Sequence, residues 1–262
     1  MGVAGALRAV ITLRPIPEPG AAALTPRPQE GRTFSTGRRV RLGDVDPTGR
    51  CRLDAVVRYL QDVARDDSAD ADLTDPMHWV VRRVLLEVKR APVFQEDLEM
   101  ATWCSGHGAR WAERRTEIRG SHGAHVEAVT VWIFVDAVTG APRPLRDDFF
   151  EIYGATAADR RISARLSLPT RPAADAESVA WPVRYGDLDV LGHVNNAAQW
   201  VPIEEARYRV DAPTEGIRAE IEHGPGIGPG EATLCWRGDA TGLDTWLLTP
   251  TGTGSVGRVR LL

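Results

Sequence analysis

The sequence VRYGDLDVLGHV at Val183–Val194 occurs a second time, in altered form, as VRLGDVDPTGRC at Val40–Cys51. The two copies share Val, Arg, Gly, Asp, Asp and Gly at six matched positions, 143 residues apart. A repeat with so long a period is not a solenoid, and it indicates two copies of one domain. After the shared second glycine the first copy continues as Arg50–Leu53 and the second as His193–Asn196. Since only the second copy has a histidine and two asparagines there, it is the copy in which we expect a site.

Composition bounds the class of protein. The 262 residues fit one large domain or two modest ones, and the repeat favours two. A net charge of -4 gives no reason to expect a nucleic-acid partner. No apolar run approaches the ~18 residues of a membrane span, so we expect no membrane partner. Cys51, Cys104 and Cys235 are odd in number and lack metal-ligand spacing, which favours a reducing, cytoplasmic location without a metal. We expect no cofactor.

The first half of the chain reads as one helix followed by strands. Apolar residues recur at helical spacing over Leu53–Ala64. Runs rich in β-branched and aromatic residues follow, and they predict strands at Val84–Lys89, Asp97–Trp103, Arg110–Arg119 and Ala128–Asp136. A long helix followed by a run of antiparallel strands predicts an α+β unit with its sheet wrapped on the helix.

The second half repeats this order. A short strand leads into the second copy, a helix is predicted over Asn196–Arg209, and strands follow at Ile217–His223, Glu231–Arg237 and Thr245–Thr249. Pro202 lies inside the predicted helix, where it costs ~3 kcal/mol unless the helix bends or begins there. A unit of about 84 residues buries little surface alone. We therefore expect it to share a sheet or an interface with the first unit.

The expected domain boundaries follow from these patterns. Residues 1–32 are rich in proline and are interpreted as a flexible leader. Residues 33–166 form the N-terminal unit, and residues 179–262 form the C-terminal unit. The Pro- and Ala-rich residues 167–178 between them are interpreted as a linker.

The second copy carries groups suited to acid–base chemistry. Gly192 permits a tight turn, and Asn195 at the start of an apolar run is a good helix N-cap. The turn therefore places Asp189 and His193 beside a helix N-terminus, whose free N–H groups can polarise a carbonyl oxygen. A carboxylate and an imidazole can orient a water and move a proton. The alternative is an architectural role, because the first copy keeps Asp46 without the histidine.

These residues resemble the hotdog-fold thioesterases, and among them the acyl-ACP thioesterases of bacteria and plants, which have two tandem hotdog units. The stretch Asp187–Asn196 looks like the signature of that family's C-terminal unit. Further landmarks in family order are Trp79–Arg83, Thr102–Gly106, Arg110–Arg115 and Val131–Asp136. The resemblance covers roughly residues 38–237.

The resemblance implies a tandem double hotdog, in which each long helix lies inside a curved antiparallel sheet and the sheets join edge to edge. It implies hydrolysis of a fatty acyl thioester carried by acyl carrier protein, with the acyl chain housed in the N-terminal unit. By resemblance, Asp189 and His193 match catalytic positions, Asn195 and Asn196 match the helix-start pair, and Glu205 matches a frequent helix glutamate. A tandem chain is expected to be a monomer or a homodimer.

The chain also departs from the family pattern. Leu191 stands where the plant enzymes carry an asparagine, and Gln199 stands where they usually carry tyrosine. The family's Glu-Cys pair falls near Gly226 and Ile227, which argues against a cysteine nucleophile. Two alternatives therefore stay open: a non-catalytic acyl or acyl-ACP binding protein, and an acyl-CoA thioesterase. Glu222-His223, on a predicted strand, is interpreted as an outward-facing polar pair, with membership of the site as the weaker alternative.

Overall fold

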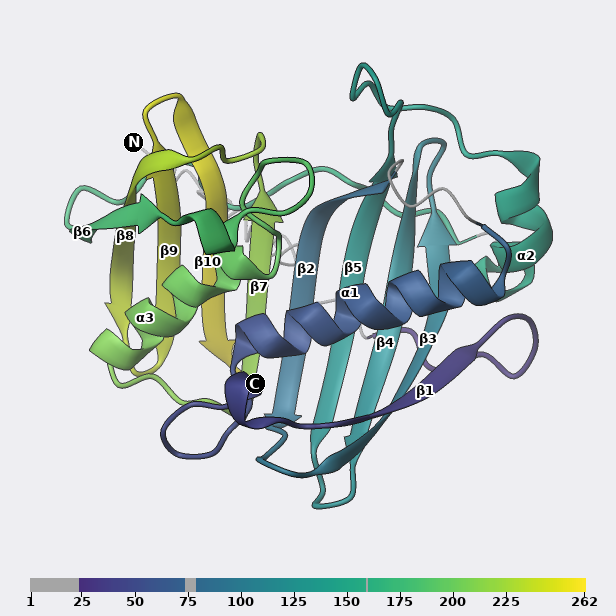
Figure 1. Ribbon diagram of the computed structural model, residues 1–262, viewed down its shortest axis with the longest axis horizontal. Helices are drawn as coiled ribbons and strands as arrows, with labels where there is room; N and C mark the ends of the chain where they lie inside the picture. Colours follow the sequence, from purple (N-terminus) through teal and green to yellow (C-terminus); the bar gives the residue numbers. More distant parts are fainter. Residues whose placement is uncertain (1–23, 74–78, 159) are drawn as a thin grey trace, which may run out of the picture.

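A single ten-stranded antiparallel sheet runs through the part of the chain that the structure describes (Figure 1). The structure is a computed structural model and describes residues 24–73, 79–158 and 160–262. The strand order is β1-β3-β4-β5-β2-β7-β10-β9-β8-β6. The strands are β1 (Phe34–Arg39), β2 (Trp79–Arg90), β3 (Asp97–His107), β4 (Trp111–Gly120), β5 (His125–Phe134), β6 (Glu177–Val183), β7 (Ile217–His223), β8 (Gly230–Asp239), β9 (Gly242–Thr249) and β10 (Gly252–Leu261).

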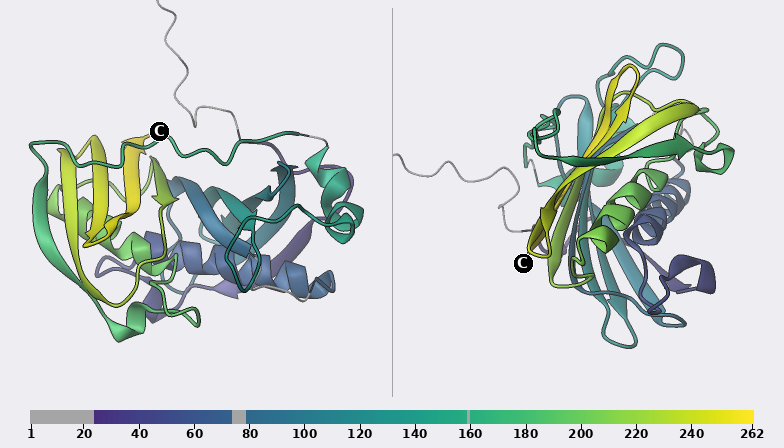
Figure 2. Two further views of the ribbon diagram at one scale, coloured as in Figure 1. Left: turned by 90° about the horizontal axis from the view of Figure 1, so that it is seen from above. Right: turned by 90° about the vertical axis from the view of Figure 1, so that its left-hand side faces the viewer.

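Two helices lie side by side on one face of this sheet (Figure 2). They are α1 (Leu53–Asp70) and α3 (Val201–Arg209), and a further helix, α2 (Asp147–Ala157), packs near β3. The buried face of α1 packs on the concave side of the sheet because its apolar residues recur every three or four positions. This is the α+β, tandem double-hotdog architecture that the sequence predicts.

The two units join through one pair of strands, β2 and β7. Their antiparallel register runs from Arg83 opposite Glu222 to Val88 opposite Ile217. The short second unit therefore completes its sheet on the edge of the first, as its length predicts. This pairing satisfies the backbone N–H and C=O groups that would otherwise be exposed at the edges of β2 and β7.

Some elements differ from the sequence-based expectation. The helix predicted over Leu53–Ala64 continues to Asp70, and β1, α2 and β10 were not predicted. The glycine-rich β10 has little strand propensity of its own and is held by pairing with β7 and β9. The helix predicted as one piece over Asn196–Arg209 begins as a 3-10 turn, η4 (Ala198–Trp200), before α3. Pro202 lies in the first turn of α3, where its missing N–H costs nothing.

The interpretation of Glu222-His223 as an outward-facing pair was wrong, because both side chains are buried. The carboxylate of Glu222 accepts hydrogen bonds from the backbone N–H groups of Ser167 (2.7 Å) and Leu168 (2.9 Å), which cross this face of the sheet. His223 Nδ1 lies 3.0 Å from the side-chain oxygen of Gln199. Burial, with a smaller effect of the nearby Arg82, lowers the pKa of His223 to about 3, so this histidine is neutral and structural.

Glu220 at the seam makes stability depend on pH. Burial raises the pKa of this carboxyl from 4.5 to about 7, although Arg83, 3.7 Å away, opposes the shift. Between these values the native state binds more protons than the unfolded state, so stability falls as pH rises. We expect the loss to be on the order of 3 kcal/mol. Urea unfolding of the wild-type protein and of Glu220→Gln, each at pH 4.5 and at about pH 7, measures this loss of stability. The variant should not show it, because glutamine does not titrate.

Candidate active site

The two copies of the repeat fold into the same turn. In each, the backbone N–H of the second aspartate, Asp46 or Asp189, donates to the carbonyl four residues later at 2.8 Å. Its Oδ1 accepts the N–H two residues later, at 2.8 Å in the first copy and 2.9 Å in the second. Gly49 and Gly192 close the turns with φ of 84° and 72°, which favour glycine. Asp46, Asp189, Gly49 and Gly192 therefore shape the same turn in both copies.

The second turn leads into a helix start with one unused backbone donor. Asn195 caps this start, because its Oδ1 accepts the N–H of Ala197 at 2.8 Å. The N–H of Asn196 makes no hydrogen bond to the described part of the chain. One asparagine therefore caps the helix, and the next leaves an N–H group available to a ligand.

The corresponding helix start in the first copy is occupied. Leu53, which stands where Asn196 stands in the second copy, donates its N–H to Glu204 Oε1 of the other unit at 2.6 Å. Arg52, which stands in place of Asn195, donates to Asp54 at 2.9 Å and to the carbonyl of Val45 at 2.7 Å. A carboxylate thus fills the place that a carbonyl oxygen would need. Only the second copy offers an open helix start.

A pocket of about 380 Å³ lies where this open helix start faces the N-terminal unit. Four of the residues singled out in the sequence line it together: Asp189, Leu191, Asn195 and Asn196. The first unit contributes residues of α1, β2, β3, β4, β5 and α2, and Leu73 after α1, to the walls. They are Gln61, Asp62, Ala64, Arg65, Ser68, Leu73, Trp79, Cys104, Ala112, Glu113, Arg114, Trp132, Phe149 and Tyr153. From Gln61 to Ser68 the pocket follows α1 for about 10 Å.

Two other candidates lie outside this lining. His193 is exposed on the same turn, and its ring packs on the backbone of Gly226 so closely that a Cβ there would meet ring atoms at 2.9 Å. Gly226 thus leaves the space that the ring occupies. Glu205 lies on the surface of α3, where Arg209 Nε donates to it at 2.8 Å. The structure therefore does not bring Glu205 to the pocket.

The pocket also contains polar residues that were not singled out as candidates from the sequence. Gln61 and Asp62 of α1 lie in the same wall as the C-terminal turn. Arg114 and Tyr153 lie further along it. Arg114 could have been found, because it falls in the inward-facing series of β4 with Ala112. The side chains of α1 could not, since their polar positions read as an ordinary solvated helix face.

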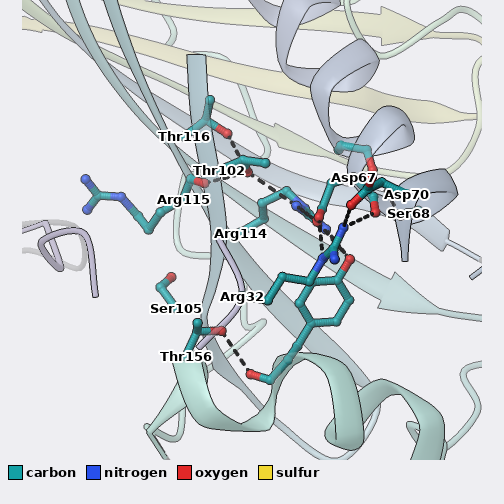
Figure 3. Close-up of polar contacts among 12 residues, drawn as sticks. Arg32, Asp67, Ser68, Asp70, Thr102, Ser105, Arg114, Arg115, Thr116 and Thr156 are labelled. Carbon is teal, nitrogen blue, oxygen red and sulfur yellow. Dashed lines mark hydrogen bonds and ion pairs between the residues drawn. The ribbon is translucent and has the colours of Figure 1, made fainter. Parts of the chain in front are cut away.

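A charged cluster, shown in Figure 3, adjoins the pocket through Arg114. The carboxylate of Asp67, only 1% exposed, accepts Arg32 Nε and the Tyr153 hydroxyl, each at 2.7 Å, and pairs with Arg114. Burial alone would lower the pKa of Arg114, but Asp67 and Tyr153 more than offset this and raise it. Arg114 is therefore a permanent cation in the pocket wall.

Cys104 is the one cysteine among the lining residues, and it is not activated. Burial raises the pKa of its thiol to about 11. The thiolate is the nucleophilic form of cysteine. Cys104 therefore stays a neutral thiol near pH 7.

Comparisons with known proteins agree with this fold. Residues 31–153 match the acyl-ACP thioesterase N-terminal domain. Uncharacterized protein Rv2001 of Mycobacterium tuberculosis is 33% identical over 210 residues, which are 80% of this chain and 84% of that protein. A putative oleoyl thioesterase from Lactobacillus plantarum superposes with a TM-score of 0.74 at 18% identity, covering 88% of this chain and 96% of that chain. The 12:0-ACP thioesterase from Umbellularia californica gives a TM-score of 0.72 at 17% identity, covering 90% and 99%.

The joined sheets, the two central helices and the open helix start define a tandem hotdog protein of the thioesterase class. With the matched domain and these relatives, the chain belongs to the acyl-ACP thioesterase family and is a thioester hydrolase. No helix in the described residues is long and apolar enough to cross a membrane.

Proposed function

We propose that this protein hydrolyses fatty acyl thioesters of acyl carrier protein, at the turn Asp189–Asn196, to a free acid and the carrier thiol. The observation that carries the proposal is the contrast between the two helix starts. The start at Leu53 is filled by Glu204, whereas the start at Asn196 opens into a pocket formed by both units. A covalent nucleophile is not needed, because a water can attack the carbonyl directly.

The helix start holds the thioester carbonyl. The free N–H of Asn196, at the positive end of the helix dipole, donates to the oxygen as negative charge develops on it. Donors of this kind contribute ~3 kcal/mol to transition-state stabilisation. The acyl chain extends along α1 toward Trp79 and Phe149 of the N-terminal unit, which supply apolar and aromatic wall.

Asp189 acts as the general base for the attacking water. Its Oδ1 is held by the N–H of Leu191, and Oδ2 makes no hydrogen bond to the described residues. The free oxygen accepts a proton from water as the water attacks the carbonyl carbon. His193, exposed on the same turn, passes the proton onward to the leaving thiolate or to solvent. Leu191 reduces the polarity of the site at the position where the plant enzymes carry an asparagine.

The test is release of free thiol from acyl-ACP and from the matched acyl-CoA. Hydrolysis of acyl-ACP by the wild-type protein supports the proposal, and faster release from acyl-CoA would favour the acyl-CoA alternative. Tight binding of acyl-ACP without any thiol release would support the non-catalytic alternative and overturn the proposal.

Gly226→Ala tests the contribution of His193 without touching the histidine. The added methyl would stand 2.9 Å from the ring and must displace it. We expect kcat/KM to fall by about tenfold to a hundredfold, because misplacing an acid–base group by ~1 Å costs rates of that order. Gly228→Ala in the same loop is the matched control, since no atom lies within 4 Å of its added methyl. If Gly226→Ala and Gly228→Ala have equal kcat/KM, His193 takes no part in the reaction.

A further inference from the structure

The inner end of the pocket is lined by hydrogen-bond donors. Arg114 keeps 13% of its side chain accessible, whereas its partner Asp67 keeps 1%. Its Nη1 and Nη2 donate to the cluster, and Nε makes no hydrogen bond to the described residues. Trp132 lines the same pocket, and its indole N–H is buried without an acceptor in the described part of the chain.

The sheet register places these two donors together. Trp132 on β5 lies opposite Ala112 on β4, and Arg114 is two residues further along β4. Both side chains therefore belong to the concave face of the sheet, and diagonal neighbours of this kind are ~7 Å apart. Figure 3 shows Arg114 pointing toward α1 while Arg115 points to the opposite side of β4. The donors are thus a feature of the pocket and not of the outer surface.

A plain alkyl chain is a poor occupant of such a wall. An alkyl end leaves the indole N–H of Trp132 unpaired and also covers the unbonded Nε of Arg114. An unpaired buried donor costs roughly 1–3 kcal/mol. An oxygen at the same place accepts from them and avoids that cost. Sites built to hydrogen-bond a substrate group reject analogues that lack it.

The charges of the cluster indicate which oxygen fits. Arg32 and Arg114 carry two positive charges, and Asp67 and Asp70 carry two negative ones, with Arg32 Nη2 donating to Asp70 at 2.6 Å. The cluster is therefore neutral. A carboxylate on the acyl chain would add an unbalanced charge, and its desolvation would be unfavourable. A neutral acceptor, a keto or hydroxyl oxygen, fits the balance.

We propose that the pocket selects acyl groups bearing a neutral oxygen, keto or hydroxyl, on the part of the chain that reaches Arg114 and Trp132. This inference rests on the proposed function and narrows its substrate to oxygenated acyl thioesters. Arg114 and Trp132 are then specificity-determining residues, because they distinguish substrates without taking part in the attack on the carbonyl.

The experiment compares thioesters matched in chain length, from hexanoyl to dodecanoyl, each as the plain acyl, the ω-hydroxy or ω-1 keto, and the ω-carboxy form. We expect kcat/KM for the hydroxy or keto form to exceed that of the plain form by about tenfold at the length that reaches the donors, and the carboxy form to be poorest. A constant or reversed ratio at every length would overturn the inference while leaving the proposed hydrolysis intact. Release of thiol from none of them would overturn the proposed function itself.

A pair of tryptophan variants isolates the donor. Trp132→Phe removes the indole N–H and keeps an aromatic ring, and it should bring the ratio of oxygenated to plain substrate close to one. Trp103→Phe is the matched control, because Trp103 also buries an unpaired indole N–H but does not line the pocket. It should leave the ratio unchanged. Arg114→Lys, which keeps the charge beside Asp67, should reduce the ratio as well. Retention of the wild-type ratio in both pocket variants would contradict the assignment.

Discussion

Replacing Asp189 with asparagine is expected to lower kcat for acyl-thioester hydrolysis by about 10²–10⁴-fold, the usual contribution of a general base. Asparagine keeps the Oδ1 that accepts the N–H of Leu191, so the turn should survive. What is lost is the second carboxylate oxygen and its capacity to accept a proton. Initial rates of thiol release, with KM measured in parallel, check this, because KM should change much less than kcat.

The repeat supplies a matched control for this variant. Asp46 has the same turn geometry in the first copy, and its Oδ1 accepts the N–H of Thr48 at 2.8 Å. It does not line the pocket. Asp46→Asn should therefore keep the wild-type kcat. If the two variants lose activity equally, the aspartate of the second copy is only architectural and a different base must be sought.

Asp67→Ala is expected to lower the free energy of unfolding by about 3–5 kcal/mol, which is the cost of removing one partner of a buried ion pair and leaving the other charge unpaired. The substitution removes the acceptor of Arg32, Arg114 and the Tyr153 hydroxyl in one step. Arg114 would then be left in the pocket wall as a cation without its carboxylate. Urea denaturation followed by tryptophan fluorescence measures the loss.

Asp70→Ala is the control for this second prediction. Asp70 pairs with the same Arg32 at 2.6 Å, but its own side chain is 58% exposed. Ion pairs of exposed groups are worth ~0–1 kcal/mol. A large loss of stability in Asp70→Ala, or a small one in Asp67→Ala, would show that the cluster is not held by the buried carboxylate.

Several parts of the fold could be predicted because local pattern and tertiary structure agree. Helix α1 has apolar residues at helical spacing, and β7 was predicted with its exact bounds, Ile217–His223. The strand β10 could not be predicted, because GTGSVGRVRL carries little propensity and is extended only through its two neighbours. The break in the second helix followed from Pro202, whose position inside the first turn only the structure gives.

The shared position of three candidate residues was predictable in the same way. Asp189, Asn195 and Asn196 are close in the chain, so one turn and one cap bring them to the same pocket. The position of His193 depends on Gly226, which is far along the chain and leaves room for the ring. The contribution of Gln61 and Asp62 depends on how α1 lies beside the second unit. Spacing within the sequence carries no information about such contacts.

By itself, the sequence of this protein indicated two related units and predicted that a site lies in the turn of the second. It did so because turn chemistry is local: aspartate, glycine and asparagine at fixed offsets specify the same hydrogen bonds wherever they occur. The tertiary structure alone decided that Glu204 fills the first helix start, and that Arg114 and Trp132 face the pocket reached from the second. Those outcomes depend on the register of joined strands and on the packing of helices from different units, which are set by contacts between distant residues.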